Sequence, residues 1–169
     1  MNESVDEHRG SSPQSFHCCV VTVSDSRTLD TDRGGALVVQ RLSSAGHVVH
    51  RREIIPDEPQ QMTMLLKQCD DDEAVQVVLL TGGTGISSRD QTYETVSAGL
   101  TKILPGYGEL FRSLSYQEIG SAAIMSRAVG GLLNQMVVLT MPGSPAAVEL
   151  AMDQIILPEL PHLVHEASK

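Results

Sequence analysis

The chain has 169 residues and a mass of 18.2 kDa, which suits one compact domain. Hydrophobic residues make up 41% and charged residues 20%, a globular composition that excludes a collagenous, coiled-coil or disordered chain. The formal net charge of -9 and the scarcity of aromatic residues disfavour a nucleic-acid or membrane partner. No apolar run is long enough to cross a bilayer and no signal peptide is recognisable, so we expect a cytoplasmic protein.

The first part of the chain alternates strand and helix patterns. Residues 1–14 are polar and lack periodicity, so we predict a flexible tail before a single domain over 15–169. Phe16–Val23 is typical of a buried strand, in which the adjacent Cys18 and Cys19 are expected to be small buried hydrophobic residues. A helix then ends at Gly46. Its apolar positions, three and four residues apart, are Val38, Val39, Leu42 and Ala45.

A second strand and a second helix follow. Val48–Ile55 has a polar middle, which indicates a strand at the edge of a sheet. Pro59 can begin the next helix. Its apolar stripe consists of Met62, Leu65, Leu66 and Cys69. Val75–Leu80 is a continuous apolar strand that runs directly into a glycine-rich segment.

The second half of the chain is predicted to contain short helices near 93–103, 109–114 and 122–128. Segments 129–133 and 136–141 are expected to form two strands joined by a tight turn at Asn134-Gln135. Pro142–Pro145 then leads into a C-terminal helix. Alternation of strands and helices favours an open α/β fold with a parallel sheet, in which ligands bind at the carboxyl ends of the strands.

The glycine-rich segment Thr81–Gly85 lies at such a strand end. It is not a Walker A motif, because no Lys-Ser/Thr follows, and it lacks the third glycine of G-x-G-x-x-G, where Ser88 stands. Three glycines beside two hydroxyls allow backbone N–H groups to approach a phosphate closely. The alternative is a tight turn that only needs positive φ angles.

Two acidic residues follow the same logic. Asp57 leaves one strand, and Asp90 lies just beyond the glycine-rich segment that leaves another. Paired acids near bound phosphates suit a Mg²⁺-dependent phosphoryl or nucleotidyl transfer, because the cation takes oxygen ligands. Each acid could equally be a turn or helix cap.

Further residues could bind an anion. Pro142, Gly143 and Ser144 precede a helix N-terminus, where free N–H groups and the helix dipole favour negative charge, although ordinary capping by Ser144 would explain them too. Ser126 with Arg127 could contact a phosphate or could lie on the surface. Arg112 has the same two interpretations.

The motifs together closely resemble the MoaB/MogA family of molybdenum cofactor biosynthesis proteins, over nearly the whole chain from about Phe16. The chain ends soon after its last helix, which places it closer to the MoaB branch. The segments that carry the resemblance are TVSDSR (22–27), IPDE (55–58), TGGTG (81–85), SRD (88–90), PGYGELFR (105–112), SYQEIG (115–120), SRAVGG (126–131) and MPGSPAAVE (141–149).

The resemblance implies a three-layer α/β/α sandwich with a mostly parallel central sheet, assembled as a homotrimer. It implies adenylyl transfer from Mg-ATP to molybdopterin, with Mg²⁺ as cofactor, ATP as co-substrate and pyrophosphate as second product. Hand-over of the product to a molybdenum insertion enzyme is part of the same expectation. A departure is Ser88, where adenylyltransferase members often have a basic residue or proline.

Site residues are carried over by motif. Asp57 and Asp90 match the acids associated with catalysis and Mg-ATP, and Glu109 is a further candidate near the ligand. The nucleotide is expected at Ser24, Asp25, Thr81, Gly82, Gly83, Thr84 and Gly85. The phosphate of the pterin is expected at Ser126, Arg127, Pro142, Gly143 and Ser144.

Two other functions stay open. A trimer could bind molybdopterin or a nucleotide without turnover, but such a protein would not need both acids. A nucleotide pyrophosphatase is suggested by a related domain, and release of AMP from a dinucleotide would reveal it.

Overall fold

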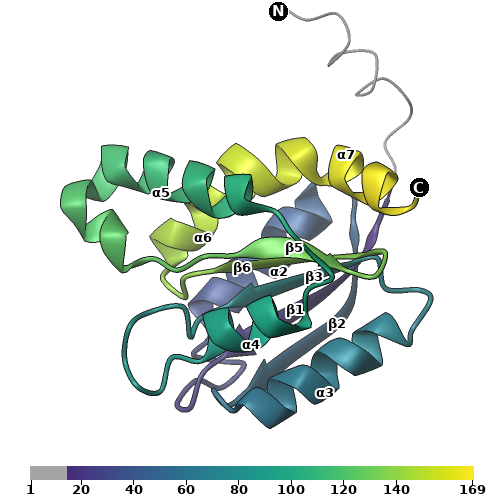
Figure 1. Ribbon diagram of the computed structural model, residues 1–169, viewed down its shortest axis with the longest axis horizontal. Helices are drawn as coiled ribbons and strands as arrows, with labels where there is room; N and C mark the ends of the chain where they lie inside the picture. The colour runs from purple at the N-terminus through teal and green to yellow at the C-terminus, as the bar shows by residue number, and fades with distance from the viewer. Residues whose placement is uncertain (1–14) are drawn as a thin grey trace, which may run out of the picture.

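A computed structural model describes residues 15–169 and contains one six-stranded sheet between two layers of helices (Figure 1). The strand order is β2-β1-β3-β6-β5-β4. Its first three neighbour pairs are parallel, and the two that involve β5 are antiparallel. The strands are β1 (His17–Val23), β2 (Val48–Ile55), β3 (Val77–Thr81), β4 (Lys102–Ile103), β5 (Gly130–Leu133) and β6 (Met136–Met141). The predicted three-layer sandwich with a mostly parallel sheet is confirmed.

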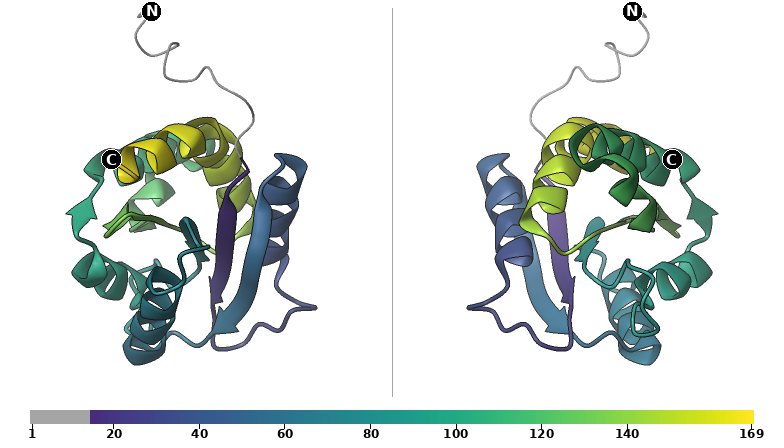
Figure 2. Two further views of the ribbon diagram at one scale, coloured as in Figure 1. Left: turned by 90° about the vertical axis from the view of Figure 1, so that its right-hand side faces the viewer. Right: turned by 90° about the vertical axis from the view of Figure 1, so that its left-hand side faces the viewer.

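The helices join these strands and cover both faces of the sheet (Figure 2). They are α2 (Arg33–Ser44), α3 (Pro59–Asp70), α4 (Thr92–Gly99), α5 (Pro105–Ile119), the 3₁₀ turn η1 (Gly120–Met125), α6 (Pro145–Ala151), the π-helical turn η2 (Met152–Ile156) and α7 (Leu157–Ala167). Among the described residues, no helix combines the length and apolar character needed to cross a membrane.

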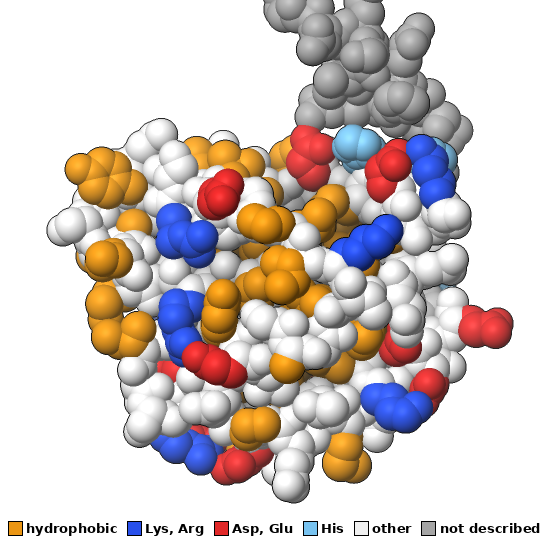
Figure 3. Space-filling model, viewed as in Figure 1, with side chains coloured by type: hydrophobic (Ala, Val, Ile, Leu, Met, Phe, Trp, Pro, Cys, Tyr) orange, Lys and Arg blue, Asp and Glu red, His pale blue; other side chains and the backbone are white. Residues whose placement is uncertain are grey.

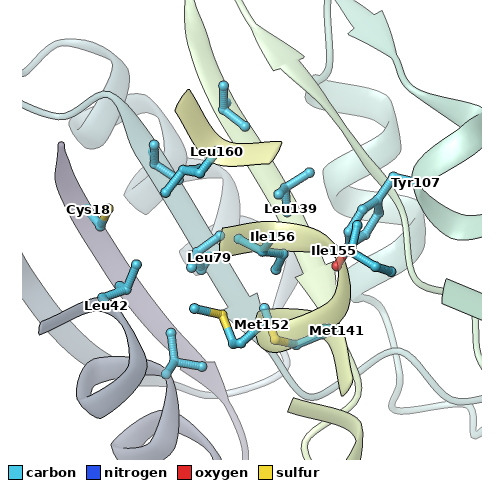
Figure 4. Packing of buried hydrophobic residues seen from close by; sticks show 14 of the residues in the cluster. Cys18, Leu42, Leu79, Tyr107, Leu139, Met141, Met152, Ile155, Ile156 and Leu160 are labelled. Atoms are coloured by element: carbon cyan, nitrogen blue, oxygen red, sulfur yellow. The ribbon is translucent and has the colours of Figure 1, made fainter. Parts of the chain in front are cut away.

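Successive side chains of the central strands point to opposite faces of the sheet and pack into two separate hydrophobic cores. Val20 and Leu79 point to the face covered by α2, α5, α6 and α7. Val21 and Leu80 point to the opposite face, covered by α3 and α4. In the first core, Leu79 and Leu139 of the sheet pack beneath the C-terminal helices (Figure 4). Burial on both faces explains why these strands are continuous apolar runs instead of alternating ones.

The edge position predicted for β2 is confirmed, and so is the antiparallel pair formed by β5 and β6. Asn134 in the turn between them has a φ of 54°. Gly46 follows α2 with a φ of 86°, the left-handed conformation expected of a C′ glycine. The three cysteines are free and buried, and the burial of Cys18 and Cys19 is as predicted.

Several predicted boundaries in the second half of the chain are wrong. The helix expected over 93–103 ends at Gly99, because the next residues pair with β5 as strand β4. The helix expected near 109–114 is longer, since Pro105 occupies its first turn and Gly106 and Gly108 lie inside it. Residues 120–125 form a 3₁₀ turn instead of an α-helix. The prediction for residues 1–14 lies outside the described part of the chain.

The direction of the strands determines where a ligand site can form. The carboxyl ends of the four parallel strands lie at the same end of the sheet, and antiparallel β5 begins there. These strands are β1, β2, β3 and β6. The loops that follow β1 and β3 lead into helices on opposite faces of the sheet. This is the topological switch point at which open α/β sheets form ligand crevices.

Candidate functional site

Most of the site residues predicted from the sequence lie in four adjacent loops, which follow the carboxyl ends of β1, β2, β3 and β6. The Ser24 N–H donates to the Ile55 carbonyl (2.9 Å), and the Gly82 N–H donates to the Met141 carbonyl (3.0 Å). These bonds extend the sheet one step beyond its strands and align the four loops. As a result, Asp25, Asp57, Thr81–Gly85 and Pro142–Ser144 stand side by side, although they are far apart in the sequence.

A cavity of about 670 Å³ opens above the ends of β1, β3 and β6, next to the start of α2. Its walls combine hydroxyl groups, glycine backbone and both signs of charge. They include Thr22, Ser24, Thr81, Gly82, Gly143 and Ser144, with Arg27, Asp30, Asp32 and Arg33 from the segment that leads into α2. Such a cavity, with the Ser24 and Ser144 hydroxyls and the Arg27 and Arg33 side chains in its walls, can hold a charged ligand.

The start of α2 is fixed by a buried carboxylate. Asp32 is 4% exposed and accepts hydrogen bonds from the Gly35 N–H (2.9 Å) and the Thr22 hydroxyl (2.7 Å). The Arg52 guanidinium on β2 donates to the same carboxylate (3.1 Å). Because every Asp32 oxygen has a donor, this acid is an N-cap and a positioning group for the cavity wall, not a free ligand.

Two glycines of the TGGTG segment have positive φ, 99° at Gly82 and 63° at Gly83. A Cβ on Gly82 would overlap the Val23 carbonyl, and a Cβ on Gly83 would overlap the carboxylate of Asp57. Backbone conformation and close approach therefore both require glycine. The segment is thus a tight turn that needs positive φ angles, and its glycines line the cavities; binding of a phosphate by its backbone stays a prediction.

A second cavity, of about 450 Å³, lies on the other side of Gly82, Gly143 and Ser144, so the two cavities share these residues as a ridge. Gly83, Thr84, Gly85, Asp90 and Ser126 line it, as do Pro142 and Ala147. The opposite wall is apolar and comes from α5 and η1. It consists of Phe111, Ile119, Ala122, Ala123 and Met125, with Ser115 among them.

Ser115 is a site residue that the sequence reasoning missed. It is 5% exposed and lines the second cavity, and within residues 15–169 its hydroxyl has no hydrogen-bond partner. A hydroxyl that lines a cavity is available to a ligand as donor or acceptor. The only signal in the sequence was its place in the SYQEIG segment, because periodicity alone treats a serine on α5 as a surface residue.

Asp57 is buried at the centre of the four loops. It is 5% exposed, its Oδ1 accepts a hydrogen bond from the Gln91 N–H (3.1 Å), and it lines neither cavity. Burial raises the pKa of its carboxyl, and the Asp90 and Asp25 carboxylates add to the rise, while the Gln91 N–H opposes it. Asp90, by contrast, faces the second cavity, and its Oδ2 accepts from the Ser87 N–H (2.8 Å).

Arg89 connects three of the loops. Its guanidinium binds both oxygens of Asp25, each at 3.0 Å, and Glu58 at 2.9 Å. The Asp25 carboxylate also accepts the Asp57 N–H (3.1 Å). The hydrogen bonds from Arg89 and from the Asp57 backbone hold the pKa of the Asp25 carboxyl below its usual value.

Arg127 and Glu109 lie differently from what the sequence suggests. The Arg127 guanidinium donates to the carbonyls of Gly85 (2.8 Å) and Asp90 (3.1 Å) and pairs with Glu94, so it braces the glycine-rich loop and lines neither cavity. Glu109 is exposed within α5 and also lines neither cavity. Ser126, next to Arg127, does line the second cavity.

Comparison with known proteins matches this arrangement to a family. Residues 19–162 match the model of a probable molybdopterin binding domain. The chain is 47% identical over 167 residues to molybdenum cofactor biosynthesis protein B of Halalkalibacterium halodurans, covering 98% of both chains. The protein of that name from Bacillus subtilis is also 47% identical, again with 98% of both chains covered.

Solved structures give the same relationship. A crystal structure of molybdenum cofactor biosynthesis protein B superposes with a TM-score of 0.91 at 47% identity, covering 94% of this chain and 99% of that one. The tungsten cofactor synthesizing protein MoaB from Pyrococcus furiosus has a TM-score of 0.82 at 34% identity, covering 94% of this chain and 100% of that one. The chain therefore belongs to the MoaB/MogA family of molybdenum cofactor biosynthesis proteins.

Proposed function

We propose that the protein transfers an adenylyl group from Mg-ATP to the terminal phosphate of molybdopterin. The observation that carries the proposal is the pair of cavities that share the ridge of Gly82, Gly143 and Ser144. Two bulky ligands placed on either side of this ridge would meet with their phosphates over the bare glycine backbone. Aligning two polyanions in this way is the main task of an enzyme that transfers a phosphoryl or nucleotidyl group.

The ligands divide between the cavities according to their lining. We place ATP in the first, polar cavity, with its phosphates toward Ser24, Thr81 and the glycine-rich loop. Molybdopterin then occupies the second cavity, where the apolar wall of α5 can cover a flat heterocycle and Ser115 can hydrogen-bond its edge. Ser144 caps α6 by accepting from the Ala147 N–H (3.3 Å), and, because Pro145 has no N–H, this leaves the Ala146 N–H as the donor at the helix start near the ridge.

In the transfer, an oxygen of the pterin phosphate attacks the α-phosphorus of ATP and forms a new P–O bond. The bond between the α-phosphorus and its bridging oxygen to the β-phosphate breaks, and pyrophosphate leaves with that electron pair. The chain contributes the backbone N–H groups of Gly83, Thr84 and Gly85, which favour negative charge beside the ridge. Arg127 holds this loop in place through the Gly85 carbonyl.

A magnesium ion would be held here only together with the phosphates of the substrates. Within residues 15–169, no three His, Cys, Asp or Glu side chains are grouped so that they could hold a metal ion alone. Mg²⁺ commonly binds one or two carboxylates together with substrate phosphates; Asp90 at the second cavity would supply one, and Asp57, buried behind Gly83, could supply the other only if the glycine-rich loop moved. When bound, the cation would neutralise charge on the phosphate oxygens.

We further propose a homotrimer. Exposed apolar side chains gather on α5 and on η1, and hydrophobic side chains crowd the corresponding left edge of Figure 3. They are Leu110, Tyr116, Ile119, Ile124 and Met125, with Ile124 80% exposed. A patch of this kind is typical of a subunit interface. A molybdenum insertion enzyme would then receive the adenylylated product.

The test is to incubate the protein with molybdopterin and Mg-ATP and to separate the products. Adenylylated pterin together with an equal amount of pyrophosphate supports the transfer. Asp57→Ala and Asp90→Ala should each lower turnover about a hundredfold or more with the fold intact. Tight pterin binding without product would favour a binding trimer, and release of AMP from a dinucleotide would favour a pyrophosphatase.

A further inference from the structure

Within the described residues, the Arg89 guanidinium is held by side chains only, and both of its partners are acidic. Two of its nitrogens donate to the two oxygens of Asp25, and the third donates to Glu58. Through these bonds the loop after β3 is fastened to the loops after β1 and β2, above the buried Asp57. No backbone carbonyl takes part in holding this guanidinium within the described residues.

The other arginine beside the glycine-rich loop is bound in a different way. Arg127 donates to two backbone carbonyls, and its side chain is 25% exposed. The Arg89 side chain is 55% exposed, and its two partners are each 47% exposed. Carbonyls in a fixed loop cannot move away, whereas exposed carboxylates can rotate, and exposed ion pairs contribute little to stability. Arg89 can therefore change partners at low cost, and Arg127 cannot.

The geometry of the Arg89–Asp25 pair indicates what the new partner would be. A guanidinium binds carboxylates and phosphates through the same two parallel N–H groups. The Asp25 carboxylate thus occupies a place on Arg89 that a phosphate group fits. Asp25 lines a third cavity, of about 520 Å³, which shares Ser24 and Arg27 with the first, so the exchange would occur beside the first cavity.

We propose that Arg89 binds the polyphosphate of the nucleotide, and that Asp25 and Glu58 hold its guanidinium as internal substitutes until the nucleotide arrives. This inference rests on the proposed function, because it takes a nucleoside triphosphate as ligand. The proposal predicts that the polyphosphate competes with the two carboxylates for Arg89. Loss of Arg89 weakens polyphosphate binding, and loss of either acidic partner strengthens it, provided that Arg89 is present.

The test measures binding of inorganic triphosphate to the full chain by calorimetry in EDTA, without pterin and without turnover. Arg89→Gln should weaken binding about tenfold or more, as expected for a lost charge-assisted hydrogen bond. Asp25→Asn and Glu58→Gln should each tighten binding about threefold to fivefold, because an exposed pair no longer competes. Circular dichroism checks that each variant is folded.

A matched control separates competition for Arg89 from the general effect of removing one negative charge. Asp30 is exposed, lines the first cavity and does not contact Arg89. Asp30→Asn should change triphosphate affinity by the same factor with and without Arg89→Gln. The effects of Asp25→Asn and Glu58→Gln should instead shrink by at least half, on a logarithmic scale, in the Arg89→Gln background.

Three results would overturn the proposal in distinguishable ways. If Arg89→Gln binds triphosphate within twofold of the wild type, Arg89 is not a phosphate ligand, and adenylyl transfer is unaffected as a function. If the effects of the two acid variants are unchanged in the Arg89→Gln background, there is no competition. If the wild-type chain does not bind triphosphate at all, the nucleotide part of the proposed function fails, and the role of Arg89 fails with it.

Discussion

Gly83 lies so close to Asp57 that no side chain fits between them: a Cβ on Gly83 would overlap Oδ2 of the carboxylate and the hydroxyl of Thr92. The glycine-rich loop is thus the cover of the buried acid. The Thr92 hydroxyl in turn donates to the Gly82 carbonyl (3.0 Å) and its N–H to the Gly83 carbonyl (3.1 Å). The conformation of the loop and the position of the acid therefore depend on each other.

Gly83→Ala should destabilise the chain by about 2–4 kcal/mol, because alanine is strained at a φ of 63° and its methyl group displaces Asp57. Urea denaturation measures the loss. Gly99→Ala is the control, since a Cβ there meets no atom within 4 Å, and its stability should stay within about 0.5 kcal/mol of the wild type. Equal effects of the two substitutions would show that the contact with Asp57 is unimportant.

The raised pKa of Asp57 predicts a dependence of stability on pH. The folded chain retains this proton to higher pH than the unfolded chain does, so the free energy of unfolding decreases as pH rises from about 4 through the folded pKa. Asp57→Asn removes this decrease. Relative to the wild type, the variant should gain stability above about pH 4 and be equal below it, as measured by urea midpoints between pH 3 and 7.

Asp25 provides the opposite case. Its lowered pKa means that the carboxylate stabilises the fold above its ordinary pKa near 3.9, and that this contribution is lost as pH falls. Asp25→Asn should therefore lose stability at pH 7 and approach the wild type in acid. A loss at pH 7 in both variants would contradict the assignment of Asp57 as a carboxyl that burial destabilises.

Much of the site could be predicted because it follows from strand direction. Asp25, Asp57 and Thr81–Gly85 each follow an apolar run, and parallel strands bring such positions together. Ser115 could not be found in this way, because its place in the second cavity depends on how α5 packs across the sheet. The partners of Arg127 were equally invisible, since its bonds to the Gly85 and Asp90 carbonyls exist only in the folded loop.

Ser115→Ala should weaken molybdopterin binding about fivefold, which corresponds to one lost hydrogen bond between neutral groups of about 1 kcal/mol. Stability should be unchanged or slightly higher, because the hydroxyl has no hydrogen-bond partner within residues 15–169. Calorimetric titration of the pterin measures the effect. Ser113→Ala, an exposed serine on the same helix, is the control. Unchanged affinity in the Ser115 variant would show that the pterin does not bind in the second cavity.

The proposed trimer predicts that a charge on the apolar patch dissociates the protein. Ile124→Asp and Tyr116→Asp should each give monomers in analytical ultracentrifugation, because an unpaired carboxylate would be buried at the interface. Met64→Asp is the control, since Met64 is 62% exposed on α3, on the opposite face of the sheet. A wild-type chain that sediments as a monomer would exclude the interface.

The most direct measurement uses ATP that is radiolabelled at either the α- or the γ-phosphate. It determines which product carries each label after incubation with the protein, molybdopterin and Mg²⁺. Adenylyl transfer predicts that the α-label enters the pterin product and the γ-label enters pyrophosphate, in equal amounts, and that Asp57→Ala and Asp90→Ala lose both. If pterin remains bound and neither label moves, the protein is a binding trimer and the central proposal is wrong.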